Sequence, residues 1–364
     1  MFTIILIALI LTLLQWGLYK IKAGRFFLFI LPIICIILQI CIIFRSVREQ
    51  ALLSSQFPLW LRIVIHLIPL LISLFIMAGF IVRKYMRMKY TKPFYHTVLR
   101  LFIFFLIGMI IILLGTVYLA QEYVIFYPNE SVEDTQYLMK ETSCKRIVLK
   151  DEFYGWEQTH ENSKEVLVYF GGNAQNTSTV FRQYKETGVF DLLKDYDIIS
   201  VDYPEYGDSE GTLSQDHLFE MADALMRYTK EHHPDQKITI IGYSIGTGIA
   251  SYAAHTYQPD HFILLSPYDN GKDLFNSYLP MFYGPLSFLI RYPLTSDEYV
   301  SDITGKSLIL YTDQDTIVKP YLTKRLIDAF TTKPTVIVYT EYTHGDMVTT
   351  PAIWKDIIEF LKST

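Results

Sequence analysis

Four long apolar stretches fill the first third of this 364-residue chain, and they constrain its fold more than any other feature. They run over residues 2–19, 26–44, 58–80 and 101–120 and carry no formal charge over most of their length. A helix needs about 20 apolar residues to cross about 30 Å of hydrocarbon, so each stretch is near the required length. Buried helices of a soluble domain would show polar faces at helical spacing, and these stretches show almost none. Residues 1–120 are therefore predicted to form a transmembrane region with four helices.

The first stretch also has the length of a secretory signal peptide. Its basic residues, Lys20, Lys22 and Arg25, follow the apolar run instead of preceding it, and no small-residue cleavage site stands beyond it. We therefore expect an uncleaved anchor.

Basic residues in the loops between the stretches predict the orientation, because short loops rich in Lys and Arg stay in the cytoplasm. The first and third loops are rich in both, whereas the second has only two arginines, offset by Glu49. This pattern predicts a multi-pass integral protein of the plasma (cytoplasmic) membrane, with the first and third loops inside the cell. The remainder of the chain, residues 121–364, is then expected on the extracytoplasmic side.

Charge divides the chain at the same point. Residues 1–120 carry 12 Lys or Arg and one acid, whereas residues 121–364 carry 20 bases and 36 acids. The acidic part has no basic run, which argues against nucleic acid as a partner. Aromatic residues make up 15% of the chain, too large a share for a disordered protein. We therefore expect a membrane region, in contact with lipids, followed by a folded acidic domain.

Few residues suggest a metal site, a disulfide or proton transport across the membrane. Cys144 is the only cysteine after residue 120, so neither a disulfide nor a cysteine zinc site is expected there. His66 lies in the third apolar stretch without an Asp, a Glu or a second His at that depth, which favours an anchor over a transporter. Nucleotide and metal motifs are also missing, namely G-x-G-x-x-G after a strand, a P-loop lysine and H-E-x-x-H. No cofactor and no metal are expected.

From about residue 145, short apolar runs rich in β-branched residues alternate with amphipathic segments. Strands are predicted at 146–149, 166–170, 198–202, 238–242, 262–266, 307–312 and 335–340. Helices are predicted at 178–194, 215–232, 245–257, 320–331 and 352–362. Continuous apolar runs such as ITIIG fit strands that are buried on both faces of a parallel sheet. The alternation predicts one doubly wound α/β domain over residues 121–364.

One connection in this pattern is too long for a simple crossover. It joins Ser266 to Ser307 and is rich in aromatic and aliphatic side chains. Connections of this length within a domain usually carry a function of their own. We expect a cap near residues 268–303.

The sharpest chemical signal is the pentapeptide Gly242-Tyr243-Ser244-Ile245-Gly246. It directly follows a predicted strand and directly precedes a predicted helix, which is the setting of a nucleophile elbow. Glycines are needed beside the serine, because a β-carbon there would collide with the neighbouring strand and helix. The helix that follows directs its N–H groups and positive end toward the same point, where they stabilise an oxyanion. Ser244 is the predicted nucleophile.

The chain from about residue 145 onward resembles the α/β-hydrolase superfamily, particularly its membrane-anchored serine hydrolases. The resemblance is carried by VLVYFGGNAQN (166–176), DYPEYGDSEG (202–211), GYSIGTGIA (242–250), TDQDTIV (312–318) and His344. It covers nearly all of the acidic part and none of the first 120 residues. It implies an α/β-hydrolase domain with a mostly parallel, doubly wound sheet and a helical cap insertion.

A serine needs a base, and the base needs a carboxylate, in the chain order Ser, acid, His that this superfamily follows. The resemblance implies that His344, in a loop before the final helix, is the base. It also implies that Asp315 is the acid, with Asp313 left open as the alternative. Relatives commonly have glycine at the position of Thr312.

The oxyanion donors implied by the resemblance are backbone N–H groups, those of Asn173 and Ile245. Supporting glycines let the backbone approach the substrate oxygen or pack closely at the elbow; they are Gly171, Gly172, Gly242 and Gly246.

These expectations add up to a membrane-anchored serine hydrolase that cleaves an ester, with a lipid or another acyl ester as its small-molecule substrate. The apolar residues of the cap favour an acyl chain. Two alternatives stay open. One is a serine peptidase or amidase with the same triad, and the other is a catalytically silent hydrolase fold that acts as a sensor or binding module.

Overall fold

The computed structural model describes residues 107–364, except 109, 112, 113, 116, 120, 123, 124, 142, 279, 281 and 364. The chain divides into two compact units, Met1–Ile125 and Phe126–Thr364. The apolar stretches at 2–19, 26–44 and 58–80, with the basic loops, lie outside the described residues. The described positions within 101–120 are helical. Among the described residues, no helix combines the length and the apolar content needed to cross a bilayer.

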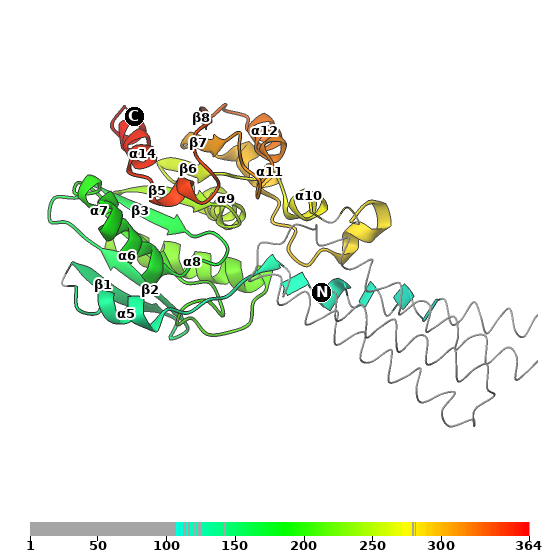
Figure 1. Ribbon diagram of the computed structural model, residues 1–364. Coiled ribbons are helices and arrows are strands. Elements are labelled where there is room, and N and C mark those ends of the chain that lie inside the picture. The colour runs from blue at the N-terminus through cyan, green and yellow to red at the C-terminus, as the bar shows by residue number, and fades with distance from the viewer. Residues whose placement is uncertain are drawn as a thin grey trace, which may run out of the picture. The chain divides into compact units, whose positions relative to one another are not determined.

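The second unit is built on one eight-stranded sheet in the order β1-β2-β4-β3-β5-β6-β7-β8 (Figure 1). The strands are β1 (Cys144–Leu149), β2 (Phe153–Gln158), β3 (Glu165–Phe170), β4 (Asp197–Val201), β5 (Lys237–Tyr243), β6 (His261–Leu265), β7 (Lys306–Thr312) and β8 (Thr335–Tyr339). Only β2 runs antiparallel to its neighbours, and the other adjacent pairs are parallel. The central strands β3, β4 and β6 are buried at every position, as their continuous apolar runs predict.

Strand β2 was not predicted, because its sequence FYGWEQ lacks a run of β-branched residues. It is joined to β1 by a tight turn in which Lys150 and Asp151 both have positive φ, 53° and 57°. Hairpin turns of this kind favour Asn and Gly, so Lys-Asp gives only a weak sequence signal. Gly155 is required within β2, because a β-carbon there would lie 2.1 Å from the Ser200 carbonyl oxygen of β4.

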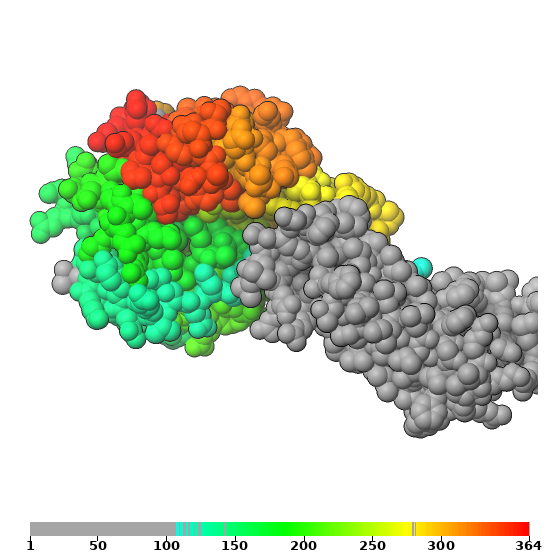
Figure 2. All heavy atoms as spheres, viewed as in Figure 1, coloured from blue at the N-terminus to red at the C-terminus, as the bar shows by residue number. Residues whose placement is uncertain are grey.

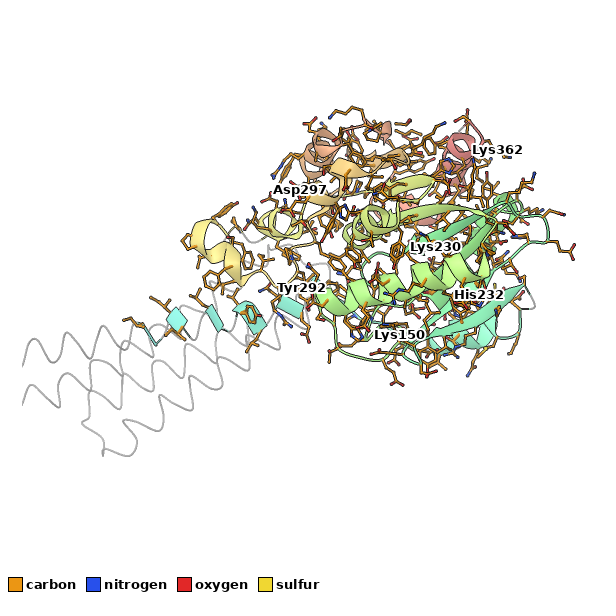
Figure 3. All side chains as sticks on the ribbon, turned by 180° about the vertical axis from the view of Figure 1, so that it is seen from behind. Lys150, Lys230, His232, Tyr292, Asp297 and Lys362 are labelled. Carbon is orange, nitrogen blue, oxygen red and sulfur yellow. The ribbon has the colours of Figure 1, made fainter. Side chains whose placement is uncertain are left out.

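Helices cover both faces of the sheet, in two layers (Figure 1). One layer contains α6 (Thr177–Thr187), α7 (Val189–Leu192) and α14 (Pro351–Ser363). The other contains α8 (Gln215–His232), α9 (Gly246–Tyr257) and α12 (Pro320–Ala329). The helix predicted at 178–194 is divided by Gly188, whose φ of 80° ends α6 in the left-handed conformation that glycine favours. Figure 3 shows the domain from behind, with α8 toward the viewer and with Lys230 and His232 at the C-terminal end of this helix.

A large apolar cluster lies between the sheet and the layer of α6, α7 and α14. Trp354 of α14 is fully buried there, and its indole Nε1 donates to the Val348 carbonyl oxygen at 2.6 Å. Its ring meets that of Tyr184 of α6 with the ring centroids 5.2 Å apart. In Figure 2 the red C-terminal segment accordingly lies against the green segments of α6 and α7. This packing fixes the strands, whose carboxyl ends carry the loops of the candidate site.

Candidate active site

Ser244 stands between β5 and α9, in the predicted strand-turn-helix setting. Its φ of 52° lies in the left-handed region, which is rare for a residue with a β-carbon. A β-carbon on Gly242 would lie 2.6 Å from that of Ala250, and one on Gly246 would lie 2.3 Å from the Gly171 carbonyl oxygen. The two glycines therefore allow the close packing that holds the turn in this conformation.

Ser244, His344 and Asp315 lie in one hydrogen-bonded line. The Ser244 Oγ is 2.9 Å from His344 Nε2, and His344 Nδ1 is 2.7 Å from Asp315 Oδ2. The residues come from the ends of β5, β7 and β8 and are separated by 100 and 29 positions in the chain. This arrangement provides a nucleophile, a base and a carboxylate that orients the base.

The structure brings Asp315 to His344 and leaves Asp313 elsewhere. Asp315 is 5% exposed, and its Oδ1 accepts from the backbone N–H groups of Ile317 at 2.9 Å and Val318 at 2.8 Å. Asp313 is exposed, and its Oδ1 accepts from the side chain of the adjacent Gln314 at 3.2 Å. Backbone donors fix one oxygen of Asp315 and leave the other directed at the imidazole.

Thr312 and Tyr243 connect the loops that carry the acid and the histidine, and the sequence did not reveal either contact. The Thr312 hydroxyl donates to the Tyr342 carbonyl oxygen at 2.6 Å. The Tyr243 hydroxyl donates to the His344 carbonyl oxygen at 2.9 Å, and the two rings lie with centroids 5.1 Å apart. Burial, and to a lesser extent the charge of Asp315, raises the pKa of Tyr243, so this hydroxyl stays protonated.

The loop after β3, residues 171–176, passes beside the elbow; we call it the β3 loop. Its first part is fixed by three hydrogen bonds. Tyr203 donates to the Gly171 carbonyl oxygen at 2.5 Å. The Gln175 Oε1 accepts from the Gly172 N–H at 2.7 Å and from the Tyr169 hydroxyl at 3.0 Å. The loop is therefore held in one conformation although it begins with two glycines.

Gly171 and Gly172 differ in their surroundings. A β-carbon on Gly172 would lie 2.5 Å from the Tyr243 ring, whereas one on Gly171 would meet no atom closer than 3.4 Å. The close approach of the β3 loop to the elbow thus depends on Gly172.

Ile245 follows Ser244 and caps the N-terminus of α9. Within residues 126–364 as described, its N–H donates to no protein acceptor. Its carbonyl oxygen, in the next peptide group, accepts from the buried Tyr268 hydroxyl at 3.0 Å, which helps to hold Ile245 at the start of the helix. An N–H at the start of a helix is suited to stabilise a negative oxygen next to the serine.

The predicted cap region, 268–303, contains α10 (Gly271–Asn276), η1 (Gly284–Leu289), α11 (Ser296–Tyr299) and η2 (Val300–Asp302). The Tyr278 hydroxyl donates to the Ile317 carbonyl oxygen, which links this region to the loop of Asp315. Tyr283 is 59% exposed and Phe288 is 72% exposed. In Figure 2 the earlier part of this region, with α10 and η1, is yellow and lies at the edge of the domain, and the later part is orange.

Part of this chain is similar to known proteins. Residues 165–282 match the family profile described as the alpha/beta hydrolase fold, a range that includes Asn173, Ser244 and Ile245. Lysophosphatidylserine lipase ABHD12 of Danio rerio is 28% identical over 197 residues, which are 48% of this chain and 49% of that protein. The protein of the same name from Bos taurus is 27% identical over 201 residues, which are 49% and 48% of the two chains. The chain thus spans about half the length of these curated relatives.

Among solved structures, esterase Pf2001 of Pyrococcus furiosus is similar with a TM-score of 0.49 and 19% sequence identity. The match covers 65% of this chain and 98% of that esterase.

Proposed function

Because this chain belongs to the α/β-hydrolase superfamily, we propose that it is a membrane-anchored serine hydrolase that cleaves lipid-like carboxylic esters. The observation that carries the proposal is the hydrogen-bonded line from Ser244 through His344 to Asp315. A serine, a histidine and an aspartate hydrogen-bonded in this order are the parts that acyl transfer requires.

In the proposed reaction, the Ser244 Oγ attacks the ester carbonyl carbon while its proton passes to His344 Nε2. The N–H groups of Asn173 and Ile245 bind the oxyanion of the tetrahedral intermediate. The intermediate collapses, the ester C–O bond breaks, and the departing alcohol takes the proton from His344. Water then attacks the acyl-enzyme with His344 as base, which releases the carboxylic acid and restores Ser244.

Asp315 acts through His344. Its carboxylate accepts from Nδ1–H, so the tautomer with a free lone pair on Nε2 is favoured and the imidazolium that forms is stabilised. The two backbone donors to its other oxygen keep it correctly oriented.

For the substrate we propose a lipid with a single acyl ester, of the lysophospholipid kind. Two curated relatives are named for activity on such a lipid. Exposed aromatic side chains on the proposed cap, near residues 268–303, provide an apolar surface for an acyl chain. We propose that residues 1–120 anchor the protein by four transmembrane helices. Residues 121–364 then form the catalytic domain outside the cytoplasm, at the plasma membrane.

A fluorophosphonate probe tests the enzyme proposal, because it phosphonylates activated serines. We expect the full-length protein in detergent to be labelled and the Ser244→Ala variant to be unlabelled. Ser251→Ala is the matched control, since Ser251 is a fully buried serine of α9, the helix after Ser244, and its hydroxyl donates to the Thr247 carbonyl oxygen. An unlabelled wild type would leave only the silent binding module, and labelling that persists in Ser244→Ala would overturn Ser244 as the nucleophile.

Hydrolysis assays then test the substrate class. We expect activity on lysophospholipids and on acyl esters that increases with chain length, and little on aminoacyl amides. The opposite preference would overturn the lipid esterase in favour of the peptidase.

A further inference from the structure

The first residues of the second unit, Phe126–Asn129, run along the β3 loop; we call this segment the strap. The Tyr127 backbone N–H donates to the Asn173 Oδ1 at 2.9 Å. The Asn129 side-chain amide donates to the Ala174 carbonyl oxygen at 2.6 Å. Its Oδ1 accepts from the Asn176 side chain at 3.3 Å. The strap therefore contacts three residues, Asn173, Ala174 and Asn176, of the loop that carries the proposed oxyanion donor.

Tyr206 joins the strap to the same loop from a third segment. It is fully buried, and its hydroxyl donates to the Asn173 Oδ1 at 2.8 Å and accepts from the Tyr127 N–H at 3.0 Å. The N–H of the next residue, Gly207, donates to the Asn129 carbonyl oxygen at 2.9 Å. Burial raises the pKa of Tyr206, so the hydroxyl remains a donor at any physiological pH.

These contacts converge on a single oxygen. The Asn173 Oδ1 accepts from the Tyr127 N–H, the Tyr206 hydroxyl and the Ala174 N–H, the last at 3.0 Å. Ala174 itself has a φ of 58°, in the region that disfavours a residue with a β-carbon. A loop in such a conformation persists only when its surroundings hold it, and here the strap and Tyr206 supply the contacts.

The strap is itself anchored in the domain. Phe126 is 2% exposed, and its ring packs edge-on against that of Tyr292, with the centroids 4.8 Å apart. Tyr292 is buried and donates to the Leu213 carbonyl oxygen at 2.9 Å. Figure 3 shows Tyr292 beside the end of α8 that is remote from His232. The strap is thus a fixed part of the domain to which the β3 loop is attached.

We propose that Tyr206 and Asn129 are positioning residues for the oxyanion donor, acting through the side chain of Asn173 and the carbonyl group of Ala174. The proposal rests on the proposed function. An oxyanion donor is effective only when it lies within 2.7–3.1 Å of the developing charge, so loosening the loop weakens binding of the transition state more than that of the substrate.

Tyr206→Phe and Asn129→Ala in the full-length protein test the proposal, with Tyr339→Phe as matched control. Tyr339 is also a buried tyrosine, but its hydroxyl donates to Asp356, in α14. We expect kcat on an acyl ester to fall about tenfold or more in both test variants, with KM changed less than about twofold. The inhibition constant of a trifluoromethyl ketone, which forms an oxyanion on the serine, should rise by the same factor as kcat falls.

The outcomes separate this inference from the proposed function. A wild type that is neither labelled by fluorophosphonate nor active overturns both. An active wild type with unchanged kcat in both variants overturns the positioning role alone. The same holds if kcat falls without a matching rise in the ketone inhibition constant, or if Tyr339→Phe loses as much activity, because a general loss of packing would then explain the result.

Discussion

Gly171 and Gly172 are adjacent and identical in type, yet only one of them is required by its surroundings. The added β-carbon at position 172 would enter the Tyr243 ring, and that ring cannot move away easily because its hydroxyl is bonded to the His344 backbone. At position 171 the nearest atom would be at 3.4 Å, an ordinary contact distance. Single methyl groups at these two positions therefore probe the site differently.

We predict that Gly172→Ala lowers kcat on an acyl ester at least about a hundredfold, because the β3 loop or the Tyr243 ring must shift and misplace the oxyanion donor or His344. Gly171→Ala, the matched control, should stay within about threefold of wild type. Equal effects of the two substitutions would contradict the steric explanation.

The two neighbouring aspartates give a second test at the residue scale. Asp315→Asn keeps an oxygen for the Ile317 and Val318 N–H groups but presents a poorer partner to His344 Nδ1. We predict a fall in kcat of about four orders of magnitude, as expected for a triad aspartate replaced by its amide. Asp313→Asn should leave kcat unchanged, because Asp313 is exposed and does not contact His344. Initial-rate measurements on both variants decide the point, and the reverse result would identify Asp313 as the acid.

At the scale of elements, α8 is joined to β2 and β4 through His233. His233 directly follows His232, the last residue of α8. It lies between two buried carboxylates at the end of the sheet where β3 and β5 begin. Its Nε2 is 2.7 Å from the Glu157 carboxylate, and its Nδ1 is 3.4 Å from that of Asp197. His160 lies near the Asp197 carboxylate, and Lys145 lies near the Glu157 carboxylate. The group ties a helix to two strands through charge instead of apolar contact.

The pH dependence of stability tests this connection. Burial opposes the charge on His233, but hydrogen bonds to Asp197 and Glu157 outweigh it and raise its pKa to about 9. The pKa of the free side chain is about 6.5, so the protonated histidine stabilises the fold fully below that pH and progressively less as the pH rises through about 9. We predict that His233→Gln lowers the melting temperature by roughly 5 °C at pH 6, and that this difference closes above pH 9.

The exposed neighbour His232 is the control. His232→Gln should leave the melting temperature unchanged, since the His232 ring lies at the surface against that of Tyr228. If the melting temperature of His233→Gln stays below that of the wild type by a constant amount from pH 6 to pH 10, the histidine stabilises the fold by its shape and not by its charge.

At the scale of the whole molecule, the proposed topology places the catalytic domain outside the cytoplasm, and a cysteine at the surface of that domain can test it. Cys144, the one cysteine after residue 120, is a poor reporter. It is only partly exposed, and burial raises the pKa of its thiol, so little reactive thiolate is present. Lys362 is exposed near the C-terminal end of α14 (Figure 3), and a cysteine introduced there is accessible.

We predict that Lys362→Cys, in a Cys144→Ser background, reacts with a membrane-impermeant maleimide added to intact cells. Lys22→Cys, in the first basic loop, should react only after the membrane is permeabilised. Labelling in the reverse pattern would put the catalytic domain in the cytoplasm. If both variants react in intact cells, the four-helix topology is wrong.

The sequence by itself determined the parts of this protein whose cause is local. The sequence pattern predicted seven of the eight strands, and for β3, β4 and β6 the reason is that parallel strands buried on both faces need continuous apolar runs. The elbow around Ser244 was recognisable because it lies directly between a strand and a helix, and because Gly242 is required by contacts with Thr247 and Ala250 in the same short segment. Strand β2 escaped prediction because its pairing with β1 and β4, and not its own composition, makes it a strand.

Tertiary structure decided everything that depends on residues far apart in the chain. Two features distinguish Asp315 from Asp313: its two backbone donors and its hydrogen bond to His344. The spacing of residues in the sequence reveals neither feature. Tyr206, Asn129, Thr312 and Tyr243 reach the site from separate segments, and their hydrogen bonds exist only after the sheet has brought those segments together. The physical reason is that a nucleophile can be encoded by its local turn, whereas the groups that orient its partners act through the packed domain.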